Sequence, residues 1–358
     1  MNEPTLKSQD ELVEFINAKI QAFPLLVFAG LVKNAGKTTA LNVINSLRRE
    51  ESLGLTSIGY DGEPQDAVYR HPKPPIQVFP GQLILTAEQF LPKELEGYEV
   101  LERWGSHAQF GSWLIVRITS ATRFRMAGPA NLPELREGIL RLKKAGAKRI
   151  YIDGALNRLS HVSFDKAGII LSTGAALGNS LEDVTQRTLH VLQLFQLPVT
   201  FEPLPPSGQN FFLTENNWFS LPRFLWTQDL KQVLPQKPDA LYLHGAFTDK
   251  LYLLLLETKR LPRYFVVDTP AQILLSQRVW QGLKSRGIGL FLSTRPELIL
   301  LTLNSWHPLT PIATEQLAEA LLLYSHVPLV DLQQGTIHLP SNLLLSGGDG
   351  VDTSIPSQ

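Results

Sequence analysis

The stretch that decides the fold is residues 24–47, PLLVFAGLVKNAGKTTALNVINSL. It contains a short apolar run, a turn rich in Gly and Asn, and a segment whose apolar residues recur at positions 40, 41, 44 and 47. This pattern predicts a strand, a loop and an amphipathic helix in succession. A loop between a strand and a helix N-terminus presents backbone N–H groups to an anion, so the stretch predicts a phosphate-binding loop.

The side chains of this loop suit a nucleotide. Lys37 can reach the β- and γ-phosphates, and Thr38 can offer its hydroxyl to Mg²⁺. The spacing departs from the usual G-x-x-x-x-G-K-[ST], because five residues separate Gly30 from Gly36 and Leu31 occupies the position where glycine is usual. A plain strand-to-helix turn is the alternative, but it leaves the coincidence of Gly, Lys and two Thr unexplained. The candidate nucleotide-binding residues in the loop are Gly30, Lys33, Asn34, Ala35, Gly36, Lys37, Thr38 and Thr39.

Composition limits the class of protein. The chain has 358 residues with 33 basic and 33 acidic side chains, so we expect substantial cores, two domains and no mainly electrostatic binding of nucleic acid. It contains no cysteine, which excludes disulfides and thiolate metal sites. No signal-like N-terminus and no membrane-spanning apolar run occur, so a cytoplasmic location is expected. Scattered single His and the absence of a Gly-x-Ser-x-Gly elbow speak against a zinc site and a serine nucleophile.

Alternating strand and helix patterns predict an α/β fold with a mainly parallel sheet. We expect a nucleotide-binding domain of the P-loop type at 1–200, and a linker rich in Pro, Gly and Ser at 201–217. A second, smaller α/β domain is expected at 218–340, with Asp268 and Asn304 at strand ends where a site would lie. Residues 347–358 are small and polar, and we expect a disordered tail at 341–358.

Residues 70–128 interrupt the alternation of strand and helix. Four β-rich runs occur there and only one short helical candidate, at 86–91. The segment therefore predicts an antiparallel, β-rich insertion in the first domain. The four runs are 76–79, 98–103, 113–119 and 123–127.

Two further strand ends carry carboxylates. A second strand at 55–60 runs into Asp61 and Glu63, and a strand from residue 147 runs into Asp153. Ligands lie beyond the carboxyl ends of parallel strands, so Asp61 and Glu63 would lie near the loop if the second strand neighbours the first. Asp61 would then complete the metal shell or position water, and Asp153 fits the acid that holds Mg²⁺ through water in P-loop enzymes. A surface turn is the alternative for Asp61 and Glu63.

One arginine lies close to this second acid. Arg158 follows Asp153 by five residues and could touch the γ-phosphate, although an arginine in a loop also commonly forms a salt bridge.

The guanine-reading motif Asn-Lys-x-Asp is missing, which favours ATP over GTP. The sequence therefore assigns catalysis to Lys37, Asp61 and Asp153, and Mg²⁺ binding to Thr38, Asp61 and Asp153.

Five motifs in order carry a resemblance to a known family. They are residues 33–39, 55–63, 126–129, 152–158 and 171–178, and together they resemble the reactivase subunit of lysine 5,6-aminomutase. A fainter similarity continues through 266–269 and 301–304. The resemblance implies a P-loop core of the SIMIBI class and an ATPase that helps to exchange damaged cobalamin in a radical mutase. Tyr60 stands where that family's pattern has Arg, so the contact there differs.

These observations predict a Mg²⁺-dependent nucleoside triphosphatase that hydrolyses the β,γ bond. The resemblance adds a cobalamin-dependent mutase as partner, and analogy within the SIMIBI class adds a homodimer. One alternative is an ATP-dependent small-molecule kinase or ligase of the dethiobiotin-synthetase type, with an acceptor bound by the β-rich insertion. Another is a scaffold that binds ATP without hydrolysis and recruits a partner through residues 205–335.

Overall fold

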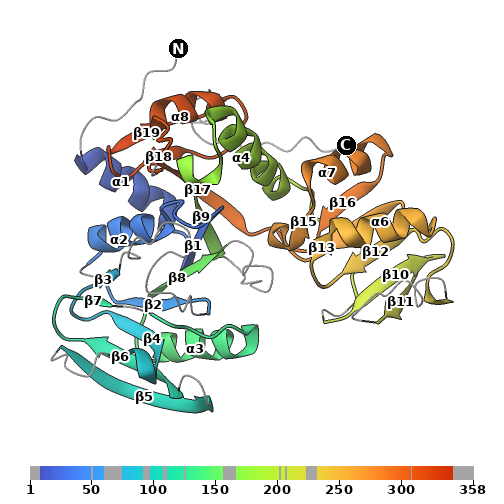
Figure 1. The fold of residues 1–358 in the computed structure, drawn as a ribbon. Helices are drawn as coiled ribbons and strands as arrows, with labels where there is room; N and C mark the ends of the chain where they lie inside the picture. Colours follow the sequence, from blue (N-terminus) through green and yellow to red (C-terminus); the bar gives the residue numbers. More distant parts are fainter. Residues whose placement is uncertain are drawn as a thin grey trace, which may run out of the picture.

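The computed structural model describes residues 9–49, 51–59, 75–91, 97–107, 111–124, 126–155, 167–200, 203–205, 208–222, 232–307 and 309–341. This part of the chain forms two lobes (Figure 1). The large lobe is built on a ten-stranded sheet, and the small lobe, residues 208–292, is built on a five-stranded sheet. The fold is therefore mixed α/β with a large, mostly parallel central sheet, as the sequence predicts.

The large sheet is parallel through its middle and antiparallel at its edges. All neighbouring pairs from β18 to β4 are parallel, whereas β19, β6 and β5 pair antiparallel. The strand order is β19 (Thr336–His338), β18 (Leu329–Asp331), β17 (Glu297–Asn304), β9 (Ala167–Gly174), β1 (Leu25–Gly30), β8 (Arg149–Ala155), β2 (Leu53–Ser57), β4 (Leu83–Ala87), β6 (Gly111–Ile118) and β5 (Tyr98–His107).

Helices cover both faces of this sheet. The strand β1 shows why, because all of its residues are buried and its side chains alternate between two cores. Leu25 and Val27 face one core and Leu26 and Phe28 face the other. The first core contains α3 (Leu132–Lys144), α4 (Leu181–Phe195) and α8 (Thr314–Leu322). The second contains α1 (Gln9–Ile20), α2 (Lys37–Leu47) and the short antiparallel pair of β3 (Ile76–Val78) and β7 (Thr122–Phe124).

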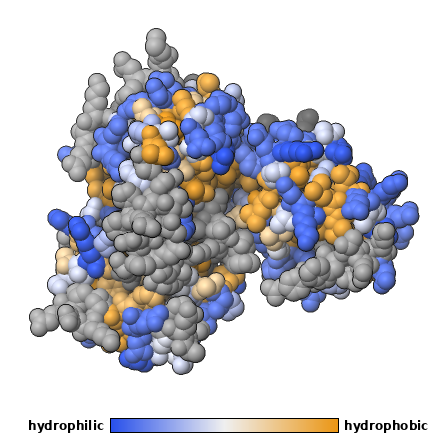
Figure 2. Space-filling model, viewed as in Figure 1, coloured by the Kyte–Doolittle hydropathy of each residue, from blue (hydrophilic) through white to orange (hydrophobic). Residues whose placement is uncertain are grey.

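The small lobe repeats the α/β plan on a smaller scale. Its sheet order is β11 (Asn217–Leu221), β10 (Asn210–Thr214), β12 (Ala240–Leu243), β14 (Tyr264–Val267) and β16 (Gly289–Leu292), and the last three strands are parallel. The intervening elements are β13 (Phe247–Thr248), α6 (Asp249–Glu257), η4 (Pro270–Gln272), β15 (Ile273–Leu274) and α7 (Gln277–Ser285). Figure 2 shows hydrophobic residues gathered on the visible face of this lobe, and the exposed Leu253 and Leu274 belong to α6 and β15.

The chain enters and leaves the small lobe at one place. The Thr200 amide donates to the Leu292 carbonyl at 2.9 Å, and the Leu292 amide donates to the Pro198 carbonyl at 2.9 Å. The helix α4 joins the two hydrophobic cores, because Leu192 packs in the large lobe and Leu194 in the small one. The segment that enters the small lobe and the segment that leaves it are therefore hydrogen-bonded to each other beside the end of α4.

Two expectations about the fold need correction, and the condition set for the position of Asp61 and Glu63 is not met. The domain expected at 218–340 is wrong at both ends, because β10 lies within the expected linker 201–217 and β17, β18 and β19 rejoin the large sheet. Of the helix expected at 86–91, residues 86 and 87 end the strand β4, and Glu88–Phe90 form only the 3-10 turn η1. The second strand, β2, does not neighbour β1, because β8 lies between them.

The β-rich segment 70–128 is confirmed in kind, since β3 to β7 all lie in it. Three of its strands, β4, β6 and β5, extend the large sheet. The residues of the tail after 341 lie outside the described residues. Among the helices that the structure describes, none combines the length and the hydropathy needed to cross a bilayer.

Candidate functional site

The loop between β1 and α2 has a fixed, partly left-handed backbone. The Leu31 amide donates to the Ser172 carbonyl of β9 at 3.0 Å, and the Ala35 amide donates to the Val32 carbonyl at 3.3 Å. Asn34 and Gly36 both have positive φ, of 65° and 96°. Glycine suits position 36, because other L-residues are strained at this φ. The sequence thus folds here into the strand, loop and helix that its pattern predicts.

The N-terminus of α2 lacks a side-chain cap. Its N-cap residue, Gly36, has no side chain, and α2 begins with Lys37, Thr38 and Thr39, whose amides precede the first helical hydrogen bond from Ala40 to the Gly36 carbonyl. Four other helices have an N-cap side chain that accepts a backbone hydrogen bond: Asn131 for α3, Ser180 for α4, Thr248 for α6 and Ser276 for α7. The first turn of α2 therefore offers N–H groups and a positive helix end to an external acceptor.

The ammonium of Lys37 and the carboxylate of Asp153 meet across this turn. The distance from Nζ to Oδ1 is 2.6 Å, with side-chain exposures of 25% and 14%. Asp153 lies on β8, opposite Phe28 of β1 and Ser57 of β2. The structure thus brings together two of the three residues to which the sequence assigns catalysis.

The residue that sequence reasoning missed at this site is Asn304, the last residue of β17. Its Nδ2 donates to the Asn34 carbonyl at 3.0 Å, and its side chain lies 3.3 Å from where a Cβ on Gly36 would be. Its Oδ1 accepts from the Trp306 amide at 3.2 Å. The sequence placed Asn304 at a strand end but in the second domain, so only the return of β17 to the large sheet reveals this contact.

The chain after β2 approaches the same edge of the sheet. The Ile58 amide donates to the Asp153 carbonyl, and the Gly128 amide donates to Ser57 Oγ at 2.9 Å. A Cβ on Gly128 would lie 1.8 Å from the Ser57 carbonyl oxygen, so only glycine fits there. The candidate residues Asp61, Glu63 and Arg158 lie outside the described residues.

The residues at the loop suit a Mg²⁺ site with few protein ligands. No group of three or more His, Cys, Asp or Glu side chains in the described part of the chain could hold a metal ion. Mg²⁺ usually keeps several waters and is held by one or two carboxylates together with phosphate oxygens, so it does not need such a group. The hydroxyl of Thr38, in the first turn of α2, and the carboxylate of Asp153, on β8, are ligands of this kind.

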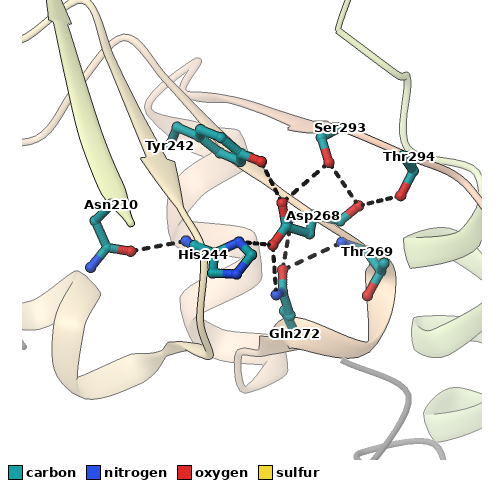
Figure 3. Close-up of polar contacts among 8 residues, drawn as sticks. All are labelled: Asn210, Tyr242, His244, Asp268, Thr269, Gln272, Ser293 and Thr294. Carbon is teal, nitrogen blue, oxygen red and sulfur yellow. Dashed lines mark hydrogen bonds and ion pairs between the residues drawn. The ribbon is translucent and has the colours of Figure 1, made fainter. Parts of the chain in front are cut away.

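A second polar cluster lies at the carboxyl ends of the parallel strands of the small lobe (Figure 3). Its centre is the Asp268 carboxylate, which accepts from Tyr242 at 2.5 Å and contacts Nδ1 of His244 at 2.6 Å. Gln272 and Ser293 donate to the same carboxylate. Burial, and then the hydrogen bond to Asp268, raise the pKa of Tyr242 above its ordinary value. The cluster ties three strand ends together around one buried negative charge.

The loop from Gly30 to Gly36, the first turn of α2, Asp153 and Asn304 form the candidate nucleotide site. Of the side chains that the sequence assigns to the site, Lys37, Thr38, Thr39 and Asp153 lie at this turn together with the loop residues Lys33, Asn34 and Ala35. Comparisons with protein-family models, with curated proteins and with solved structures find no match to this chain.

Proposed function

We propose that the protein is a Mg²⁺-dependent nucleoside triphosphatase with a P-loop site between β1 and α2. The observation that carries this proposal is the Lys37–Asp153 pair beside a helix N-terminus without a side-chain cap. A lysine, a carboxylate near the carboxyl end of β8 and a helix N-terminus without a side-chain cap suit a triphosphate and its metal ion. A structural salt bridge alone would account for the pair but not for its position at a helix that begins Lys-Thr-Thr after Gly36.

The proposed reaction is attack of water on the γ-phosphorus, with cleavage of the bond to the β,γ-bridging oxygen. Lys37 and the first amides of α2 stabilise the negative charge of the phosphates. For this, the Lys37 ammonium leaves Asp153 and turns to the phosphate oxygens, which frees the carboxylate. Thr38 and the freed Asp153 would hold Mg²⁺, which would supply positive charge to the β- and γ-phosphates.

The preferred nucleotide in this proposal is ATP, because the sequence lacks the Asn-Lys-x-Asp motif that reads guanine. Phosphate release from ATP and GTP, with and without Mg²⁺, tests this choice. Faster release from GTP than from ATP would contradict it.

The central test compares Lys37→Ala with Lys143→Ala. Lys143 is exposed on α3, away from the loop, and its replacement removes the same charge. Removing a group that stabilises the transition state typically costs about 100- to 1000-fold in turnover, so Lys37→Ala should lose that much while its circular dichroism and melting temperature stay close to those of Lys143→Ala. Undiminished phosphate release in folded Lys37→Ala protein would disprove the proposal.

Two outcomes distinguish the alternative functions. Turnover that begins only when a small-molecule acceptor is added would indicate a kinase or ligase. Calorimetric binding of ATP without phosphate release over hours would indicate a scaffold. Both outcomes keep the nucleotide site and replace the hydrolase.

The more specific form of the proposal is a reactivase for a cobalamin-dependent aminomutase. It is supported by the order of the motifs that resemble that family, of which 33–39 follows β1 and 171–178 begins within the neighbouring strand β9. The test is ATP-dependent recovery of activity in a purified aminomutase that carries an inactive cobalamin, with Lys37→Ala as control. Equal recovery with both proteins would exclude this form while the phosphate-release test still judges the hydrolase.

A further inference from the structure

The contact between His244 and Asp268 in the small lobe leaves one ring nitrogen of the histidine open (Figure 3). Nδ1 of His244 lies 2.6 Å from the Asp268 carboxylate, so in the neutral imidazole this nitrogen carries the proton and Nε2 carries a lone pair. The side chain is 32% exposed. Nδ1 is buried, whereas Nε2 is not, and Nε2 has no partner among the residues that the structure describes. The lone pair of Nε2 is therefore accessible to a ligand from solution.

Neighbouring hydrogen bonds hold this imidazole in place. The His244 amide donates to Oδ1 of Asn210 at 2.9 Å, which fixes the backbone at the end of β12. Asp268 accepts from Tyr242 at Oδ1 and from Gln272 at Oδ2, so each carboxylate oxygen has a donor besides His244. A histidine held at one nitrogen by a hydrogen-bonded carboxylate is the usual arrangement of a metal ligand, because it orients the ring and makes the other nitrogen more basic.

A metal at this place would need ligands from elsewhere. No group of three or more His, Cys, Asp or Glu side chains in the described part of the chain could hold a metal ion. A metal bound at His244 by these residues therefore brings most of its ligands with it. Metal tetrapyrroles do so, because the ring fills the equatorial positions and the protein supplies an axial side chain, as a proximal histidine does for haem iron.

The chain beside His244 leaves room for a broad ring. A Cβ on Gly245 would meet nothing within 4 Å, and Ala246 is small and exposed. The strand β13 follows and pairs with β15, on which Leu274 is half exposed. These segments follow the carboxyl ends of β12 and β14, the edge at which α/β sheets bind ligands. Small residues and an exposed leucine therefore lie along the chain next to the open nitrogen.

A role for His244 as a catalytic base has less support. Acyl or phosphoryl transfer needs hydrogen-bond donors that stabilise the developing negative charge. The hydroxyls of Ser293 and Thr294 donate to the Asp268 carbonyl, and the N-terminus of α6 is capped by Thr248. These donors are already used, so the group that this edge offers to a ligand is the lone pair of Nε2.

We infer that His244 is an axial ligand for the metal of a tetrapyrrole, either a haem or a corrinoid. Nε2 replaces a water molecule on the metal, without change of its oxidation state, and Asp268 is the positioning residue that orients the ring. The inference does not rest on the proposed nucleotide site. With a corrinoid it would give the reactivase form of the proposal a cofactor-binding residue.

The test is an absorption titration of the full-length protein without ATP. The two probes are aquocobinamide, a corrinoid without its own axial base, and ferric haem, each used separately. Replacement of metal-bound water by imidazole should shift the visible bands and saturate at one ring per chain below about 0.1 mM probe. The probe that shifts identifies the class of ring, and no shift with either probe would overturn the inference.

Two histidine variants test the ligand. His244→Gln should abolish the shift, whereas His326→Gln, which removes an exposed histidine between α8 and β18, should keep it. If His244→Gln does not fold, mass spectrometry of the unmodified protein decides instead, because a bound ring should protect His244 from diethyl pyrocarbonate. A shift that persists in folded His244→Gln, or an unprotected His244, would contradict the assignment.

Two further variants test the role of Asp268. Loss of the carboxylate behind a metal ligand typically costs about 10- to 100-fold in affinity, so Asp268→Asn should bind the ring that much more weakly. Tyr242→Phe removes a hydrogen bond to the same carboxylate but leaves the contact with His244, so its affinity should stay close to that of the unmodified protein. Melting temperatures of both variants separate this effect from a general loss of stability. Equal weakening in the two variants would refute the positioning role.

Discussion

Replacing Asn304 by alanine tests whether the return strand β17 shapes the nucleotide site. The change removes the hydrogen bond from Nδ2 to the Asn34 carbonyl and the packing against Gly36. One hydrogen bond of this kind contributes about 0.5–1.5 kcal/mol, and its loss leaves two residues of positive φ less restrained. If the change costs a bound nucleotide about 1–1.5 kcal/mol of binding free energy, the affinity for that nucleotide falls about five- to twelvefold.

The assay is a titration with a fluorescent ATP analogue in the presence of Mg²⁺. Asn42→Ala is the matched control, because Asn42 lies on α2 and also exchanges hydrogen bonds with a distant segment, donating to Pro75 and accepting from Gln77. Asn304→Asp keeps the shape of the side chain but replaces the donor with a charged acceptor, so it should bind nucleotide at least as weakly as Asn304→Ala. Affinity within twofold of the unmodified protein in both Asn304 variants would refute this role.

Three further predictions concern stability. Burial raises the pKa of Tyr151 to about 12 from an ordinary value of 10, so the stability that its neutral form provides is intact below pH 10 and is lost as the pH rises towards 12. At 1.36 kcal/mol per pH unit, the loss in the free energy of unfolding is about 2–3 kcal/mol. Urea titrations across this pH range should show a smaller loss in Tyr151→Phe. Asp268→Ala leaves Tyr242 without its acceptor and should lower the free energy of unfolding by about 3 kcal/mol in urea, with ATP affinity unchanged. Gly128→Ala should lower the melting temperature sharply because its Cβ has no room, whereas Gly245→Ala, which meets open space, should not.

The loop and its neighbouring elements could be predicted because their signals are local. Apolar runs, glycine positions and helical spacing all lie within residues 24–47, and each reports on its own neighbourhood. Asp153 could be placed because it lies near the carboxyl end of a buried strand, and parallel strands present their carboxyl ends at one edge. The pair of Lys37 and Asp153 is therefore the part of the candidate site that sequence reasoning found.

The neighbours of each strand in the sheet could not be predicted, because the residue pattern of an apolar strand does not indicate which sheet it joins. The pattern of residues 298–304 fits a strand of the small lobe as well as a strand beside β9. The contact of Asn304 with the loop therefore could not be predicted. The order β1-β8-β2 was hidden for the same reason. The run at 83–87 was missed because five buried residues fit a short helix or a strand equally well.

The segments that enter and leave the small lobe pair with each other beside α4, and this has a consequence for how the chain could have been assembled. Val199 forms a parallel bridge with Leu292, so the points where the small lobe begins and ends are neighbours. A segment whose ends meet can be excised and the gap closed by a short linker, because the remaining chain keeps its path. The large sheet would keep every strand in that shortened protein, so the small lobe has the geometry of a cassette inserted between α4 and β17.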